Sequence, residues 1–212
     1  MVNNLTHKRI ADRLDAAFFS GGANIDQLSI YMDLLIKWNR KTNLTALKLD
    51  PLSDEAIDRL IVEPVLASTH FSDRDLVAVD LGSGGGSPGI PLRIQVPTLK
   101  MRMVESRSMK CAFIREAIRM VGLASTSVEE SRFELLSGRH ELKQAADVIT
   151  IRAVRIDSEL VELIRFLIKP GGRIYRFASH TESVVPESLV VDSSVPLVLS
   201  LSSIFQTIRI AD

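Results

Sequence analysis

Side chains that could cross-link the chain or hold a metal ion are scarce in this sequence. Cys111 is alone among 212 residues, which excludes an intramolecular disulfide framework, and its apolar helical surroundings predict a buried side chain. His7, His70, His140 and His180 show no short ligand spacing with each other or with Cys111. We therefore expect neither redox chemistry nor a metal site.

Long apolar runs and an excess of one charge are missing as well. No stretch approaches the roughly 18 apolar residues that cross a bilayer, and no apolar segment of a secretion signal follows the first basic residues. We expect a cytoplasmic protein without a membrane partner, and nothing demands more than a monomer. The 26 basic and 26 acidic residues cancel, which argues against indiscriminate polyanion binding but allows a local basic face.

Helical periodicity dominates the amino-terminal third of the chain. Apolar residues recur every three or four positions from Ile10 to Phe18 and again from Leu28 to Trp38. Trp38 has helical spacing with Tyr31 and Leu35, which favours packing in the core over stacking on a nucleic-acid base. We expect residues 1–70 to form a helical cap on the rest of the chain.

From residue 71 onward, short apolar runs alternate with helical stretches. This βαβ alternation predicts a Rossmann-like α/β fold with a mostly parallel sheet, right-handed crossovers and helices on both faces. Two apolar runs between residues 188 and 210 predict a closing hairpin with an antiparallel strand. We expect residues 71–212 to form one compact domain, with parallel strands at residues 76–81, 99–104, 127–129, 148–151 and 173–177.

One glycine-rich segment carries most of the functional information. A predicted buried strand runs through five glycines into a helix start, in the sequence Val79-Asp80-Leu81-Gly82-Ser83-Gly84-Gly85-Gly86-Ser87-Pro88-Gly89-Ile90-Pro91. Glycines let the backbone pack against a ligand and adopt positive φ angles, and Pro88 suits the first helical turn. A tight turn without a ligand would need only one or two glycines, so we expect a binding site here.

Dinucleotide-binding enzymes use a related turn. Gly82 and Gly84 begin their fingerprint, and Glu105 lies about 20 residues further on, at the end of the next strand, where such enzymes hold a ribose. The third fingerprint glycine should follow three residues after Gly84, but that position is Ser87. An NAD-dependent oxidoreductase therefore stays an alternative with an incomplete motif.

The nucleophile elbow of α/β-hydrolases also matches the turn. Ser87 stands between two glycines at the required spacing, and Asp157 and His180 follow in the chain order of that fold. The residue after the nucleophile must donate its backbone N–H to the oxyanion hole, and Pro88 has none. The mechanism would lose a donor worth about 3 kcal/mol in the transition state, which argues against a hydrolase.

A methyltransferase that uses S-adenosylmethionine explains more of the pattern. Asp80 ends the first strand, Ser83 and Gly84 belong to a turn that admits the methionine part and the sugar, and Glu105 ends the second strand, where a carboxylate can accept both ribose hydroxyls. This cofactor carries no pyrophosphate, so a third fingerprint glycine is not needed. Because Glu105 precedes Ser106 at a predicted helix start, a plain helix cap is the alternative for its carboxylate.

Several segments together resemble one known family. Residues 38–46 are similar to its W-x-x-x-x-N-L-T-A segment, and residues 80–92 to its D-x-G-[ST]-G-x-G-x-P-G-I-P-L turn. Residues 104–106, 131–134 and 151–154 resemble its segments after the second, third and fourth strands. On these motifs the chain, from about residue 31 to residue 176, resembles the RsmG (GidB) family, which methylates guanine N7 in small-subunit ribosomal RNA.

The resemblance implies both a cofactor site and a partner. Carried over position by position, it implies S-adenosylmethionine contacts at Gly82, Ser87, Phe133, Glu134 and Arg152. Phe133 also fits a core aromatic, Glu134 a solvated helix residue and Arg152 a surface cation. Their positions after predicted strands favour the site, because open α/β sheets bind ligands beyond the carboxyl ends of their strands. The implied partner is ribosomal RNA or the small ribosomal subunit.

The chain departs from the family pattern at positions expected on the RNA side. Arg59 stands where the family usually has His, with Glu63-Pro64 in place of Asp-Ser; Met109 and Ala178 stand in segments where the family shows Gly-Lys and Lys-Gly. These departures leave open a methyltransferase of another RNA or of a small molecule. They also leave open a catalytically idle cofactor-binding module.

Methyl transfer of this kind predicts no catalytic base. The sulfonium cofactor is already an activated electrophile, and guanine N7 has a lone pair and no proton, so the protein needs to position its reactants more than to move protons. The target base has to be exposed or flipped, and a basic rim would bind the phosphates around it. We expect this rim, with Arg152, at Arg40, Asn43, Arg107, Lys110 and Arg155.

Overall fold

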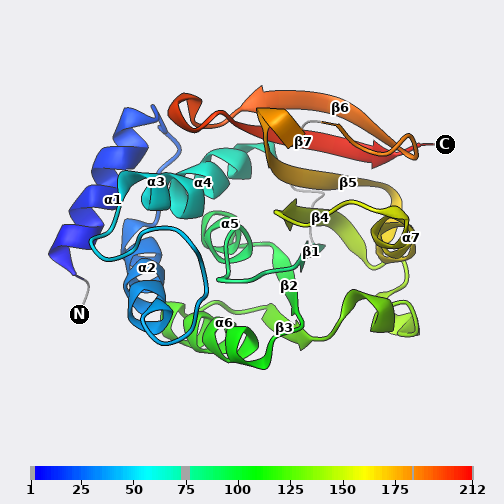
Figure 1. Cartoon of the computed structure of the whole chain (residues 1–212), viewed down its shortest axis with the longest axis horizontal. Helices are drawn as coiled ribbons and strands as arrows, with labels where there is room; N and C mark the ends of the chain where they lie inside the picture. The colour runs from blue at the N-terminus through cyan, green and yellow to red at the C-terminus, as the bar shows by residue number, and fades with distance from the viewer. Residues whose placement is uncertain (1–2, 73–76, 183, 212) are drawn as a thin grey trace.

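A seven-stranded sheet forms the centre of the computed structural model, which describes residues 3–72, 77–182 and 184–211 (Figure 1). The strands lie in the order β3-β2-β1-β4-β5-β7-β6. Strands β1 to β5 pair in parallel, whereas β7 pairs antiparallel with both β5 and β6. The bounds are β1 Val77–Leu81, β2 Lys100–Glu105, β3 Thr126–Glu130, β4 Ala146–Arg152, β5 Ile168–Ser179, β6 Leu189–Pro196 and β7 Ser203–Ile210.

The predicted Rossmann-like α/β fold, its parallel strands and its closing antiparallel hairpin are confirmed. Leu76, the first residue of the first predicted strand, lies outside the described residues. Strand β5 begins at Ile168 and not at the predicted Arg173. Its early part passes close to β4, since a Cβ on Gly172 would lie only 2.9 Å from the carbonyl oxygen of Asp147. The predicted strand therefore missed the glycine-containing stretch before Arg173.

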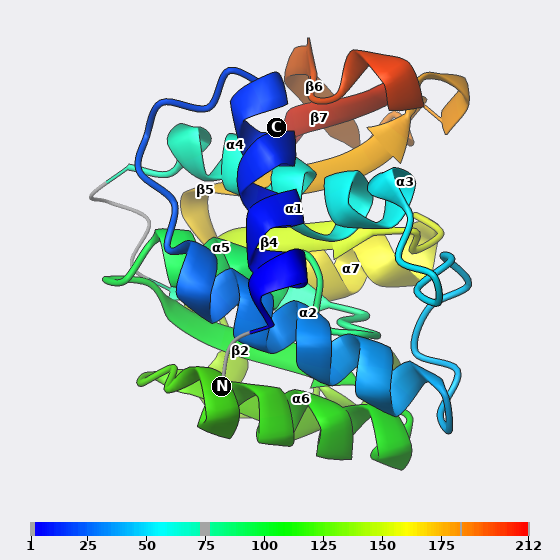
Figure 2. The ribbon, with the colours of Figure 1, turned by 90° about the vertical axis from the view of Figure 1, so that its left-hand side faces the viewer.

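Helices cover both faces of the sheet (Figures 1 and 2). Helix α7 packs on one face, while α5, α6 and the amino-terminal helices lie on the other, with α1 outermost. The helical bounds are α1 Asn4–Ala16, α2 Ile25–Asn39, α3 Asp54–Ile57, η1 Asp58–Val62, α4 Glu63–Ala67, η2 Ser68–His70, α5 Gly89–Gln95, α6 Ser108–Val121, η3 Phe133–Leu135, η4 His140–Leu142, α7 Ser158–Leu167, η5 His180–Glu182 and η6 Leu199–Leu201.

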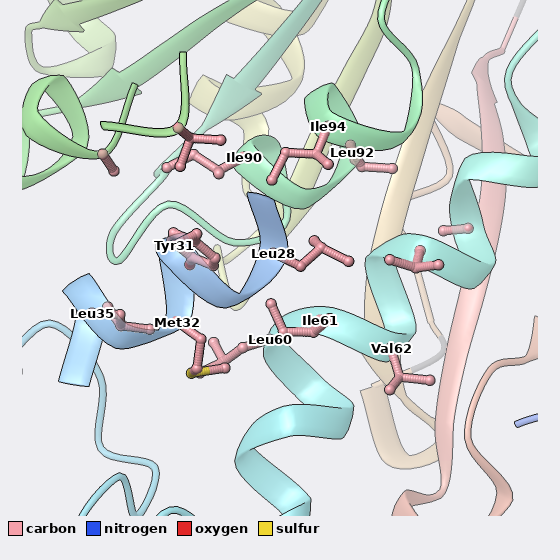
Figure 3. Packing of buried hydrophobic residues seen from close by; sticks show 14 of the residues in the cluster. Leu28, Tyr31, Met32, Leu35, Leu60, Ile61, Val62, Ile90, Leu92 and Ile94 are labelled. Atoms are coloured by element: carbon pink, nitrogen blue, oxygen red, sulfur yellow. The ribbon is translucent and has the colours of Figure 1, made fainter. Parts of the chain in front are cut away.

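The core consists of two apolar layers, one on each face of the sheet. Successive strand residues point to opposite faces, so Ala78 joins the layer under the amino-terminal helices and Val79 joins the layer under α7. In the first layer, α2, η1 and α5 pack against one another through buried side chains that Figure 3 shows together, namely Leu28, Tyr31, Met32, Leu35, Leu60, Ile61, Val62, Ile90, Leu92 and Ile94. The amino-terminal helices therefore share a core with the sheet.

The predicted cap helices are present, with one error at the end of α1. Trp38 packs edge-on against Phe113 at 5.8 Å between ring centroids, which confirms its predicted core packing. Phe18, predicted to lie on the apolar face of α1, is 92% exposed. It has a φ of 56°, and the next residue, Phe19, donates its backbone N–H to Leu14. A left-handed residue thus closes the helix before the apolar pattern ends.

Candidate functional site

A cleft of about 490 Å³ lies at the carboxyl ends of the parallel strands, and we call it the main cleft. Parallel strands present their carboxyl ends at one edge, so the loops after β1, β2, β4 and β5 meet there. The amino-terminal segment covers it, and the side chain of Asn39 holds this cover by accepting the backbone N–H groups of Leu44 and Thr45 at 2.8 and 3.0 Å. The wall includes Leu44, Thr45, Arg59, Glu63, Gly82, Ser83, Gly84, Ser87, Glu105, Arg107, Lys110, Arg152, Val154 and Phe177.

The glycine turn forms the floor of the main cleft. Gly82 has a φ of 76°, and a Cβ there would lie 2.8 Å from the Cγ2 atom of Val154. Gly84 has a φ of 54°, but the atom nearest to its imagined Cβ is 3.7 Å away. Backbone N–H groups of Gly82 and Ser83 both donate to the carbonyl of Val104 at 3.0 Å. The turn therefore needs glycine for two reasons, close packing at Gly82 and backbone conformation at Gly84.

The carboxylate of Glu105 joins the glycine turn to the segment that precedes α6. Its Oε2 atom accepts the N–H of Gly84 at 2.9 Å, and its Oε1 atom accepts the N–H groups of Ser106 and Arg107 at 2.9 Å each. Both of these donors precede α6, whose N-cap residue is Arg107 without a side-chain cap hydrogen bond, so the carboxylate does not act as the plain helix cap that was the alternative. Because two carboxylate oxygens offer about four acceptor positions, Oε2 keeps room for one more donor.

A second, smaller hollow adjoins the main cleft, and we call it the side hollow. Gly82 and Glu105 belong to the walls of both. Phe133 and Glu134 line the side hollow but not the main cleft. The predicted cofactor residues other than Asp80 thus divide between two adjacent spaces. The remaining wall of the side hollow consists of Ser106, Ser131 and Arg132.

Asp80 lies below the site and not in its wall. Its side chain is 1% exposed, and its Oδ1 atom accepts the hydroxyl of Thr150 at 2.6 Å. The Oδ2 atom has no hydrogen-bond partner within the described residues. Burial raises the pKa of Asp80, and the hydrogen bonds from Thr150 and Ser83 oppose this rise. The geometry therefore makes Asp80 a support for the turn.

Arg152 joins the amino-terminal helices to the glycine turn. Its guanidinium donates to Oε2 of Glu63 at 2.8 Å, to the hydroxyl of Ser87 at 3.2 Å and to the carbonyl of Arg59. It also stacks over the ring of Phe177, 4.4 Å from the centroid. Arg152 was predicted as a cofactor contact, and it lines the main cleft.

The predicted substrate residues do not gather as one rim. Arg107 and Lys110 line the main cleft, and neither forms an ion pair within the described residues. Arg155 lines two neighbouring hollows beside the loop after β4. Arg40 is paired with Asp50 at 3.0 Å outside the cleft wall. Asn43 is exposed and also lies outside this wall.

Some cleft residues were not predicted from the sequence. Arg59 and Glu63 were noted only as departures from a family pattern, and Phe177 only as the end of a strand, yet all three line the main cleft. A signal for Phe177 existed, since ligands bind at the carboxyl ends of strands. Within the described residues, no three His, Cys, Asp or Glu side chains gather as a metal site requires, and no helix is long and apolar enough to cross a membrane.

Comparisons with known structures match the fold. A methyltransferase dependent on S-adenosylmethionine from Aquifex aeolicus superposes with a TM-score of 0.55 at 12% identity, over 71% of this chain and 90% of that one. The mitomycin 7-O-methyltransferase MmcR superposes with a TM-score of 0.59 at 18% identity, over 97% of this chain and 68% of that one. At such low identity these likenesses establish the fold alone.

Comparisons of sequence identify the family. The model of the GidB family, described as rRNA small subunit methyltransferase G, matches residues 24–188. Ribosomal RNA small subunit methyltransferase G of Xanthomonas euvesicatoria pv. vesicatoria is 36% identical over 167 residues, which cover 77% of this chain and 70% of that protein. The enzyme of the same name from Stenotrophomonas maltophilia is 39% identical over 144 residues, 67% of this chain and 63% of that protein. The chain belongs to the GidB family.

Proposed function

We propose that this protein transfers the methyl group of S-adenosylmethionine to N7 of a guanine in small-subunit ribosomal RNA. Family membership carries the proposal, because the matched relatives are named as methyltransferases of that RNA. The position of the main cleft supports it, since the glycine turn and Glu105 meet at the edge of the sheet where α/β proteins bind ligands.

The two adjacent spaces suit the two ends of this cofactor. We assign the methionine part to the main cleft beside Ser83 and Gly84, because both residues line it and Gly84 has no side chain to fill it. Glu105 lines both spaces, and its Oε2 atom can accept a ribose hydroxyl in addition to the N–H of Gly84. We assign the adenine to the side hollow, where Phe133 offers an aromatic ring and Glu134 an acceptor.

The protein's own contribution to the reaction is positioning. Bound S-adenosylmethionine supplies an activated methyl group, and the residues of the cleft have to bring a base nitrogen in line with it. N7 of guanine carries no proton, so no side chain needs to act as a base, and no histidine stands among the described residues of the cleft wall. Arg107 and Lys110 place positive charge in the wall, where RNA phosphates would bind.

Two measurements, made one after the other, test the proposal. Isothermal titration of the protein with S-adenosylhomocysteine should show binding, whereas NAD should show none. Small ribosomal subunits incubated with the protein and S-adenosylmethionine should then gain 7-methylguanosine, detected by mass spectrometry of the digested RNA. Binding of S-adenosylhomocysteine without methyl transfer would refute the proposed reaction on the small subunit. Binding of NAD alone would refute S-adenosylmethionine as the cofactor.

A further inference from the structure

Glu63 presents a carboxylate oxygen that nothing in the described structure uses. Its side chain is 2% exposed and lines the main cleft. The Oε2 atom accepts the guanidinium of Arg152 at 2.8 Å, but the buried Oε1 atom has no hydrogen-bond partner within the described residues. An unsatisfied buried carboxylate oxygen is costly, so a donor that reaches Oε1 from the cleft would gain binding free energy.

The reaction proposed above leaves one recognition problem unsolved. N7 is present in both guanine and adenine, so the reacting atom cannot by itself distinguish the two purines. The distinction lies on the opposite side of the base, where guanine presents two donors, N1–H and the 2-amino group, and adenine presents an acceptor at N1. Enzymes that act on an extruded base commonly read this Watson–Crick edge.

We propose that Glu63 selects guanine by accepting hydrogen bonds from N1–H and the 2-amino group of the target base. This inference rests on the proposed function. Arg152 holds Oε2, which fixes the carboxylate and leaves Oε1 as its unused acceptor for the purine edge. A base bound in this way turns its N7 away from α4, into the cleft whose floor is the glycine turn. Adenine would bring the lone pair of N1 against the carboxylate and be rejected.

The geometry sets one requirement for this contact. Oε1 is buried in the described structure, so the cleft wall has to part slightly before a base can reach it. Glu63 lies at the start of the short helix α4, and Arg59, four residues earlier, lines the same wall with a partly exposed side chain. Burial of Glu63 also explains the selectivity, because a desolvated acceptor tolerates no purine that fails to supply a donor.

Inosine offers a direct test, because it differs from guanosine only by the missing 2-amino group. Small ribosomal subunits are reconstituted from ribosomal RNA in which a minor fraction of guanosine is replaced at random by inosine. After incubation with the protein and S-adenosylmethionine, the RNA is digested, and 7-methylinosine is compared with 7-methylguanosine by mass spectrometry. When little of either base has reacted, this ratio, corrected for the inosine content, gives the relative kcat/KM for the two bases without knowledge of the target position.

The wild-type protein should favour guanosine at least about tenfold, which is the effect of one hydrogen bond to a charged group. In Glu63→Gln, the amide oxygen should turn to Arg152 and the amide N–H to the cleft, so the preference should fall towards one. Glu116→Gln is the matched control, since Glu116 pairs with Arg119 on the outer surface of α6, and it should keep the wild-type ratio.

The possible outcomes distinguish a failure of the role of Glu63 from a failure of the proposed methyltransferase function. A wild-type ratio near one, or an unchanged preference in Glu63→Gln, would overturn the role of Glu63 while methylation itself stands. No 7-methylguanosine from the wild-type protein would overturn both. Binding of S-adenosylhomocysteine checks that each variant folds; should Glu63→Gln fail this check, Glu63→Asp, which withdraws the carboxylate by one methylene, should lose the preference in the same way.

Discussion

The hydroxyl of Tyr31 donates a hydrogen bond of 2.7 Å to the carbonyl oxygen of Gly85. Tyr31 is fully buried in α2, so this bond joins an amino-terminal helix directly to the glycine turn. Burial raises the pKa of Tyr31, which keeps the hydroxyl protonated as a donor at any ordinary pH. The shape of the turn therefore depends on a residue that precedes it by more than fifty positions.

Tyr31→Phe should weaken both the fold and the site. Removal of the hydroxyl leaves the carbonyl of Gly85 without this donor, and we expect the free energy of unfolding to fall by about 1–3 kcal/mol in urea titrations. The affinity for S-adenosylhomocysteine should fall as well. Tyr175→Phe is the control. The hydroxyl of Tyr175 donates a hydrogen bond of 2.8 Å to the carbonyl of His70, and neither residue lines the cleft, so this variant should keep the affinity for S-adenosylhomocysteine.

Gly84→Val should abolish cofactor binding and reduce the stability of the fold only moderately. The atoms nearest to the imagined Cβ are 3.7 and 4.0 Å away, so a Cβ fits, and the larger side chain would extend into the cleft that Gly84 lines, while the positive φ adds strain of about 1–3 kcal/mol. Gly122→Val carries the same strain, with a φ of 75° and open surroundings at the end of α6. Equal affinities of the two variants for S-adenosylhomocysteine would contradict the placement of the site.

Asp80→Asn should change how stability depends on pH. Burial raises the pKa of Asp80 in the folded protein above its ordinary value, so the folded state holds the proton more tightly than the unfolded state. The stability that this proton contributes is fully present below about pH 4 and is lost as the pH rises through the pKa of the folded state. The variant should therefore gain stability relative to the wild type over this rise, as measured by urea unfolding at successive pH values. A constant difference between the two proteins would refute the shift.

Arg152→Met should be strongly destabilising because it leaves Glu63 buried without its cation. Breaking such a pair costs about 3–5 kcal/mol. The combination of Arg152→Met with Glu63→Gln should cost clearly less than the sum of the single changes, since the double variant buries no lone charge. A double-mutant cycle in urea measures this coupling, and additive losses would mean that the two side chains do not act as a pair.

The fold could be read from the sequence because its signals are local. The apolar run of β1, the glycines after it and the alternation of strands and helices each lie within a few consecutive residues. The end of α1 was missed because the apolar pattern continues through Phe18, while the backbone conformation at that residue ends the helix. Periodicity reports which residues are apolar and not where a helix stops.

The candidate site could be predicted only where it depends on one segment. The glycine turn and Glu105 were found, since a strand end followed by glycines indicates a ligand edge. The pairing of Arg152 with Glu63 joins residues that are 89 positions apart. The sequence around each residue contains no signal of this contact. Arg40 was placed on the rim by its charge, and in the structure it pairs with Asp50 outside the cleft wall.

The main cleft takes its wall from Leu35 in α2 as well as from Ser179 at the end of β5. Such a cavity is complete only while the amino-terminal helices remain docked on the sheet. Docking and cofactor binding are then linked equilibria, and a ligand present at one hundred times its Kd would stabilise the docked state by about 2.7 kcal/mol. A ligand in the main cleft would thereby help to hold the amino-terminal helices on the sheet.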